Sequence, residues 1–201
     1  EKPYNCSSGY FRRLDGTTQK MTNHELRIMF QEHEKISFEE KTNRSVSWKD
    51  ISREKIRNFL KEADISIRKI IPQNILTSLS LVQKGRITNA GALMFASRVD
   101  KFIPHAESIF AAFKGTDKTN IYDRHDVKDD LLIQFNEAVA FLKKHLNVRS
   151  EIRGFDRSDI YEIPLDALRE AVVNAIVHRN YTINGTSIYV RIFDDRVEIE
   201  N

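Results

Sequence analysis

The 201-residue chain has room for one large domain or two small ones, and its 30% charged and 40% hydrophobic residues give an ordinary globular composition without a membrane span. Its net charge of +3 implies no particular partner, but the first 70 residues carry 15 Lys/Arg against 11 Asp/Glu, a mildly basic balance that permits contact with DNA. Cys6 is the only cysteine, which excludes an internal disulfide and favours a reducing, cytoplasmic compartment.

The first predicted elements are a strand over residues 10–14 and a short helix that begins near residue 22. Thr22 and Glu25 have the spacing of a capping box, in which each side chain accepts a hydrogen bond from the backbone N–H of the other. One strand and one helix cannot form a core, so this segment is expected to be the end of a larger domain. Arg12 and Arg13 either line a solvated strand edge or contact DNA.

The next segment is predicted to be helical with one hairpin. Its expected parts are a polar linker over residues 37–50, helices over 53–61 and 73–81, a tight hairpin over 82–87, and a helix over 89–96 capped by Thr88. Two helices and a hairpin suggest a winged-helix arrangement, in which Lys84 and Arg86 would contact DNA phosphates. The row Arg53, Arg57 and Lys61 either faces water or binds an anion. Alternatively, the segment is only a spacer.

The C-terminal part alternates strands and helices. The expected elements are a buried strand over residues 107–114, a charged loop over 117–130, a long amphipathic helix over 131–146, strands over 148–155 and 159–163, a helix over 164–179, and a hairpin with strands over 186–193 and 196–200.

The helix over 164–179 carries the candidate site. Apolar residues surround most of it, so it is expected to be largely buried. Glu170, Asn174 and His178 recur every fourth residue and therefore share one face. A polar stripe on an apolar helix costs free energy unless protein, water, metal or ligand satisfies it.

This helix and the hairpin after it resemble a known family. Residues 169–181, REAVVNAIVHRNY, and residues 188–201, IYVRIFDDRVEIEN, are similar to the divergent GHKL-type ATPase domain known as RecG-like C-terminal, or ATP-dependent DNA helicase-related. Residues 88–95, TNAGALMF, resemble the middle segment of that family. Residues 9–13, GYFRR, and the capped helix that begins near residue 22 resemble the closing strand and helix of the Schlafen/AlbA-type DNA-binding domain, behind which the ATPase domain sits in transcriptional regulators.

The resemblance implies an α+β chain in three parts. Residues 1–45 would be the C-terminal remnant of the AlbA-type domain, 46–125 a winged-helix-like connecting segment, and 126–201 the first half of a GHKL-type α/β sandwich. In the superfamily, the adenine-binding box and the glycine-rich lid would follow the last strand. The resemblance therefore implies a fragment with an incomplete nucleotide site.

The resemblance also implies roles for the polar stripe. Glu170 would be the catalytic base that orients water, Asn174 the ligand of Mg²⁺, and Asn174, His178 and Arg179 the contacts to ATP. A carboxylate in apolar surroundings accepts a proton more readily, and an amide oxygen is a suitable hard ligand for Mg²⁺. Nucleotide binding is a safer inference than hydrolysis, because histidine kinases of the superfamily bind ATP without this glutamate.

Other interpretations remain open. Glu170 could instead pair with Arg191 or Arg196 across the hairpin. The chain could mainly bind DNA through the basic residues named above (Arg12, Arg13, Lys84 and Arg86), or it could be a connector and homodimerisation module without enzymatic activity. A helicase motor is not expected, because the seven glycines include no G-x-x-x-x-G-K-[ST] phosphate loop.

Overall fold

The chain has an α+β fold. The structure, a computed structural model, describes residues 4–6, 9–14, 16–23, 25–26, 37–146, 148–153 and 156–201, and gives the backbone alone for 4–6, 13–14, 148–153 and 156–160. The chain divides into two compact units, Glu1–Ser37 and Phe38–Asn201, which are described separately.

The N-terminal unit contains a three-stranded antiparallel sheet. Strands β1 (Tyr4–Cys6), β2 (Gly9–Leu14) and β3 (Thr17–Lys20) lie in that order. Strand β2 confirms the strand predicted over residues 10–14, whereas β1 and β3 were missed. The capping box is also confirmed, because Thr22 N–H donates to Glu25 Oε2 (2.8 Å) and Glu25 N–H donates to Thr22 Oγ1 (3.2 Å). The rest of the predicted helix lies outside the described residues.

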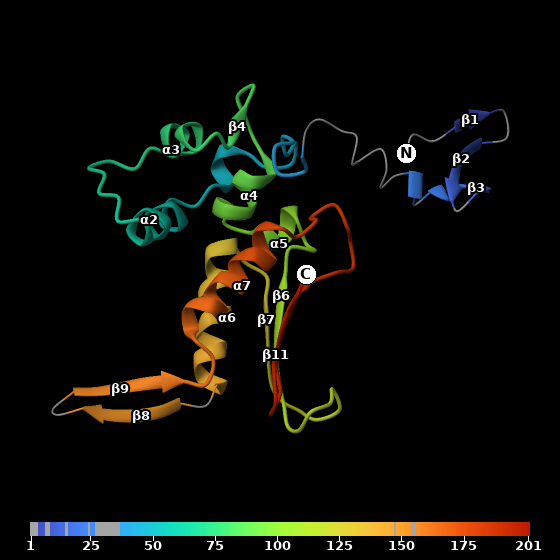
Figure 1. Ribbon diagram of the computed structural model, residues 1–201. Coiled ribbons are helices and arrows are strands. Elements are labelled where there is room, and N and C mark those ends of the chain that lie inside the picture. Colours follow the sequence, from blue (N-terminus) through green and yellow to red (C-terminus); the bar gives the residue numbers. More distant parts are fainter. Residues whose placement is uncertain are drawn as a thin grey trace. The chain divides into compact units, whose positions relative to one another are not determined.

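The larger unit begins with short helices around one hydrophobic core (Figure 1). They are η1 (Trp48–Asp50), α2 (Arg53–Glu62), α3 (Pro72–Ser78), α4 (Asn89–Phe95) and α5 (Val99–Phe102), with the hairpin β4 (Val82–Gln83) and β5 (Arg86–Ile87) before α4. Ile56, Leu76 and Phe95 are fully buried in this core. The predicted cap is confirmed, since Thr88 Oγ1 accepts a hydrogen bond from Gly91 N–H at 3.2 Å.

The linker predicted over residues 37–50 is wrong. Val46 is buried in the core, and Trp48 packs against it. The side chain of buried Asn89 accepts a hydrogen bond from the side chain of Asn43 and donates one to the carbonyl of Phe38, both at 2.9 Å. This polar segment is ordered by contacts with residues some 46 to 51 positions away, which composition does not show.

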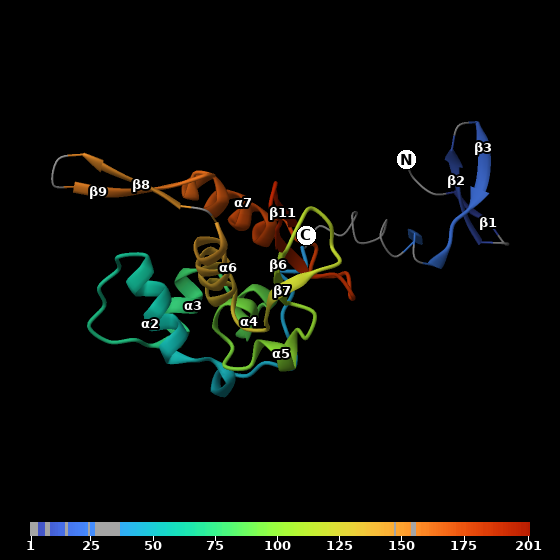
Figure 2. The ribbon, with the colours of Figure 1, turned by 90° about the horizontal axis from the view of Figure 1, so that it is seen from below.

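The second core lies between a sheet and two helices. Strands β6 (Ser108–Phe113), β7 (Ile121–Val127), β10 (Ile188–Ile192) and β11 (Val197–Glu200) form a sheet in the order β11-β10-β6-β7, in which β10 and β6 are parallel and the other pairs antiparallel. Helices α6 (Leu131–His145) and α7 (Leu165–Val177) cover one face of this sheet (Figures 1 and 2). The hairpin β8 (Val148–Arg153) and β9 (Asp156–Tyr161) joins the two helices.

Strand β7 corrects the loop predicted over residues 117–130. Its charged residues divide between the two faces of an edge strand. Asp123 reaches Lys144 (2.7 Å) and His145 (2.8 Å) on α6, whereas Arg124 pairs with Asp126 (2.8 Å) two residues along. The predicted boundary between residues 125 and 126 falls inside β7.

Candidate functional site

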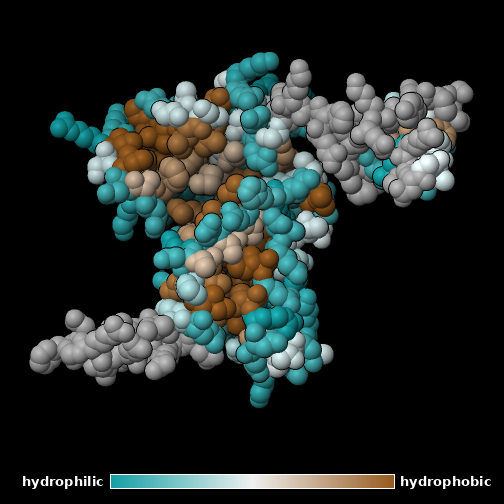
Figure 3. Space-filling view, viewed as in Figure 1, coloured by the Kyte–Doolittle hydropathy of each residue, from teal (hydrophilic) through white to brown (hydrophobic). Residues whose placement is uncertain are grey.

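Helix α7 presents the predicted polar stripe to solvent. Leu168, Val172, Ala175 and Ile176 are buried against the sheet. On the other side Glu170, Asn174 and His178 are exposed, and they are accompanied by two valines, Val173 (42% exposed) and Val177 (66% exposed). The expectation that the helix is largely buried is therefore wrong for this side, because neither neighbouring helix nor sheet covers it. Figure 3 shows hydrophobic surface in the region of α6 and α7.

The side chains of the stripe are also unpaired within the described residues. Within the part of the chain that the structure describes, no side chain forms a hydrogen bond or ion pair with the side chains of Glu170, Asn174 or His178. Arg191 pairs instead with Glu200 (2.5 Å) and Glu198 (3.6 Å). Arg196 pairs with Glu198 and Asp195, each at 2.8 Å. The alternative in which Glu170 pairs across the hairpin is therefore wrong.

The last described residue of the chain contacts α7. Asn201 follows β11, and its side-chain amide donates to the backbone carbonyl of Ala175 on α7 at 3.0 Å. Ala175 is the residue after Asn174. The carboxyl end of β11 is therefore held against the C-terminal half of α7, through a residue that is buried rather than one of the stripe.

Arg179 has a different environment from the stripe. It is buried (4% exposed), and its guanidinium donates to the backbone carbonyls of Glu107 (3.0 Å), Thr186 (2.6 Å) and His105. Burial lowers the pKa of Arg179 from its usual range. These contacts hold the loop after α7 against the start of β6. Nη1 and Nη2 of its guanidinium are thus occupied by the protein's own carbonyls, whereas Nε is buried without a partner among the described residues. Arg179 therefore does not share the exposed face of the three stripe residues.

Tyr181 anchors the same loop from the other side. Its ring is buried in the core around α4, and its hydroxyl donates to the carbonyl of Ile176 at 3.1 Å. Burial raises the pKa of Tyr181 to about 12. The C-terminal end of α7 is therefore fixed by Arg179 and Tyr181 together.

Of the four residues predicted to contact DNA, two have exposed side chains without an ion pair among the described residues. Lys84 (φ 50°) and Gly85 (φ 73°) form the two-residue turn of the β4–β5 hairpin, and the side chains of Lys84 and Arg86 are exposed with no ion pair to any described residue. Arg12 pairs with Glu25 at 2.5 Å. The side chain of Arg13 lies outside the described residues.

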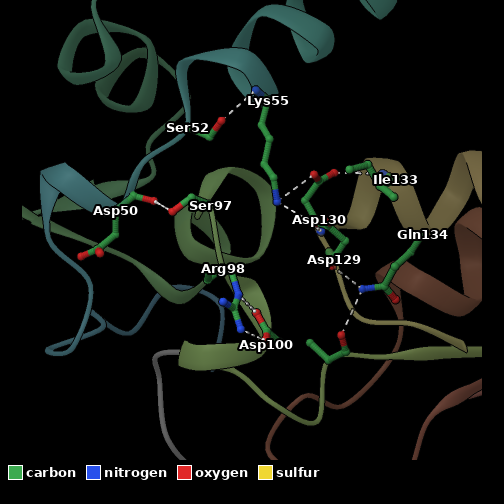
Figure 4. Close-up of polar contacts among 11 residues, drawn as sticks. Asp50, Ser52, Lys55, Ser97, Arg98, Asp100, Asp129, Asp130, Ile133 and Gln134 are labelled. Carbon is green, nitrogen blue, oxygen red and sulfur yellow. Dashed lines mark hydrogen bonds and ion pairs between the residues drawn. The ribbon is translucent and has the colours of Figure 1, made fainter.

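A polar cluster that the sequence did not indicate joins the two cores of the larger unit (Figure 4). The side chain of Lys55 on α2 pairs with Asp129 and, at 3.2 Å, with Asp130. Asp130 accepts the N–H of Ile133 at 2.9 Å and so caps α6, while burial raises the pKa of its carboxyl. Asp-Asp before an apolar helical run was a visible N-cap signal. Lys55, which pairs with Asp129 from 74 positions earlier in the chain, had no comparable signal in the sequence.

Gln134 completes this cluster. Its buried side chain donates to the carbonyls of Asp129 (2.7 Å) and Ala106 (3.1 Å) and accepts from the hydroxyl of Ser108 (2.6 Å). Every polar atom of the amide thus has a partner, and the start of α6 is fixed to the start of β6.

Two other features are absent from the described residues. No group of three or more His, Cys, Asp or Glu side chains is arranged there to hold a metal ion. Within the same residues, no helix combines the length and apolar character needed to cross a membrane.

Comparisons with known proteins leave the chemistry open. No family model and no curated protein matches the chain. Among solved structures, the chain is similar to the DIP2311 protein from Corynebacterium diphtheriae, a structural-genomics target, with a TM-score of 0.65 and 17% identity. The similarity covers 97% of this chain and 39% of that one, so this chain spans about two fifths of that protein's length. At such low identity the likeness shows the fold alone.

Proposed function

We propose that the exposed face of α7 binds the phosphates of ATP together with Mg²⁺, in a DNA-associated, cytoplasmic regulator. The observation that carries this proposal is the stripe itself. Glu170 and Asn174 lie one turn apart, are exposed, and have no partner among the described residues, whereas the opposite side of the helix is packed onto the sheet. The family resemblance assigns the ligand.

The donor set of the stripe suits a magnesium-bound nucleotide. Asn174 offers one neutral amide oxygen, so phosphate and water oxygens would complete the coordination of the ion. The bound Mg²⁺ would neutralise phosphate charge. His178, at the C-terminal end of α7, would contact the nucleotide, and Val173 and Val177 supply apolar surface beside it.

Glu170 is positioned for a step after binding. Its carboxylate would orient a water molecule and accept its proton, which is the ordinary task of a general base. Because the side chain is exposed, additional structure or the ligand must exclude bulk water before turnover is efficient. Nucleotide binding at α7 therefore comes first, and hydrolysis through Glu170 would follow it.

A titration of ATP into the full 201-residue chain, followed by backbone NMR, tests this proposal. We expect weak binding in which the signals of residues 170–178 move, and we expect the movement to require Mg²⁺, because the metal links Asn174 to the phosphates. The same titration with EDTA is the control. Signal changes elsewhere only, or equal changes with and without Mg²⁺, would contradict the proposal.

A second function, DNA binding, is favoured by the β4–β5 hairpin. Lys84 and Arg86 project from a tight turn and have no ion pair with any described residue. We expect Lys84→Glu/Arg86→Glu to weaken binding to duplex DNA and to reduce the salt slope by about 2, roughly one for each phosphate that the variant no longer neutralises. Fluorescence anisotropy at several salt concentrations measures both quantities.

A matched pair elsewhere controls for the loss of net charge. Lys114 and Lys143 are also exposed and have no ion pair among the described residues. Lys114→Glu/Lys143→Glu should therefore change the affinity much less. Equal losses in both double variants would show that net charge alone is responsible, and would refute the hairpin as a DNA contact.

A further inference from the structure

A groove lies between the C-terminal half of α2 and the loop that leads to α3. Its volume is about 310 Å³, near the lower end of the roughly 300–1,000 Å³ that ligand sites occupy. The walls are apolar and the rim is charged. The lining residues are Leu60, Ile65, Ile67 and Ile70 on the walls and Arg57, Lys61 and Asp64 on the rim, together with Ser66.

The surface around this groove exposes several aliphatic side chains. Ile65 is 49% exposed and Ile67 is 44% exposed, and Ile71 and Leu79 close by are exposed as well. Figure 3 shows a hydrophobic area over α2, α3 and the loop between them, bordered by hydrophilic residues. Contiguous apolar surface with a polar border marks interaction sites.

The basic charges at and beside the groove are not neutralised by any described residue. Arg53, Arg57 and Lys61 follow one another at spacing four on α2, and none forms an ion pair with a described residue. Lys55, on another side of the same helix, does pair, with Asp129 and Asp130. Because like charges at this spacing repel, carboxylates supplied from outside would stabilise the row.

Arg68 and Lys69 in the following loop add to this charge. Both are exposed, and neither pairs with a described residue. Asp64 is the single acidic residue that lines the groove. The surroundings of the apolar walls are therefore predominantly basic.

The shape and chemistry distinguish among macromolecular ligands. DNA would use the cations but would gain nothing from exposed isoleucines. A lipid bilayer would meet the exposed isoleucines and the cations, but it presents no side chain of fixed shape to occupy the concave part of the groove. A short peptide can place apolar side chains in the groove and carboxylates on its rim.

We infer that this groove binds an acidic, amphipathic segment of a partner protein. One or two bulky apolar side chains of that segment enter between Ile65, Ile67 and Leu60, and its Asp or Glu side chains pair with Arg57 and Lys61. The site is separate from the α7 face, and it does not depend on whether that face binds nucleotide.

Selection from a random peptide library on the immobilised 201-residue chain tests the inference. Enriched peptides, resynthesised with a fluorescent label, are measured by anisotropy. We expect them to combine acidic residues with bulky apolar ones and to bind more weakly at high salt. Arg57→Glu/Lys61→Glu and Ile65→Ser/Ile67→Ser should each weaken binding by about tenfold or more, since each removes half of the recognition.

The control is Lys84→Glu/Arg86→Glu, which makes the same change of charge on the β4–β5 hairpin. All of these side chains are exposed, so the variants should fold, and circular dichroism verifies this. Enrichment of basic or purely polar peptides, or binding that the groove variants leave unchanged, overturns the inference. Self-association or binding to anionic vesicles that Ile65→Ser/Ile67→Ser abolishes would overturn it too, by assigning the groove to a second copy or to a membrane.

Discussion

Replacing Lys55 by Met is expected to lower the free energy of unfolding by about 3 kcal/mol at neutral pH, because the substitution leaves a buried carboxylate without its cation. The side chain of Lys55 is 12% exposed and that of Asp130 is 3% exposed, so solvent cannot replace the lost partner. Denaturant unfolding followed by circular dichroism measures the change. Lys61→Met, on the exposed side of the same helix, is the control and should change stability by less than about 0.5 kcal/mol.

The Lys55→Met defect should depend on pH in a defined direction. Burial already raises the pKa of Asp130, and removal of Lys55 raises it further. A carboxyl whose pKa is higher in the folded state binds a proton on folding, so the variant gains stability as the pH falls toward the unfolded value of about 3.9. The difference in unfolding free energy between Lys55→Met and the natural chain should therefore become smaller at acidic pH. A difference independent of pH would show that Lys55 acts through packing.

Replacing Arg179 by Leu is expected to cost about 3 kcal/mol of unfolding free energy, because three backbone carbonyls lose their donor at once. The residue follows the polar stripe directly in sequence, and the resemblance would make it a nucleotide contact. The structure gives it the structural task of holding the loop after α7. Thermal and denaturant unfolding without any ligand measure how much Arg179 contributes to the free energy of unfolding.

Arg169→Leu on the exposed side of α7 is the matched control for Arg179→Leu. The Arg169 guanidinium lies 5.0 Å from the centre of the Phe135 ring, an interaction worth about 0.5–1 kcal/mol at an exposed site. We expect the substitution to cost no more than that. If Arg179→Leu is as mild as Arg169→Leu and yet removes nucleotide binding, the structural assignment of Arg179 is wrong.

Local signals in the sequence predicted several of the regular elements, although they missed β1, β3 and α5. Caps such as Thr22 with Glu25 and Thr88 depend on residues three positions apart, and both appear in the structure. The apolar strand β6 and the alternating hairpin β10–β11 were also predicted near their observed bounds. In each case the information lies within a few neighbouring residues.

The wrong predictions concern elements defined by distant partners. Strand β7 was expected to be a loop because its residues are mostly charged, and only its pairing with β6 and the charges of α6 make it a strand. The segment 37–50 was expected to be a linker, but Asn89 and the first core order it. The amino-acid composition of a segment carries no information about contacts with such distant residues.

The candidate site was predicted in part. The helical period showed that Glu170, Asn174 and His178 share a face, and they do. Periodicity could not show that this face is open to solvent, because Val173 and Val177 on the same side suggested burial. It also could not show that Arg179 turns inward to three carbonyls.

In the NMR titration with ATP and Mg²⁺, we expect the response of α7 to depend on Asn174, because its amide oxygen would link the chain to the magnesium-bound nucleotide. Asn174→Ala should abolish the signal changes of residues 170–178. Asn58→Ala, the same substitution at an exposed position of α2, should leave them intact. Identical titrations of the two variants would contradict the claim, whatever the affinity of the natural chain.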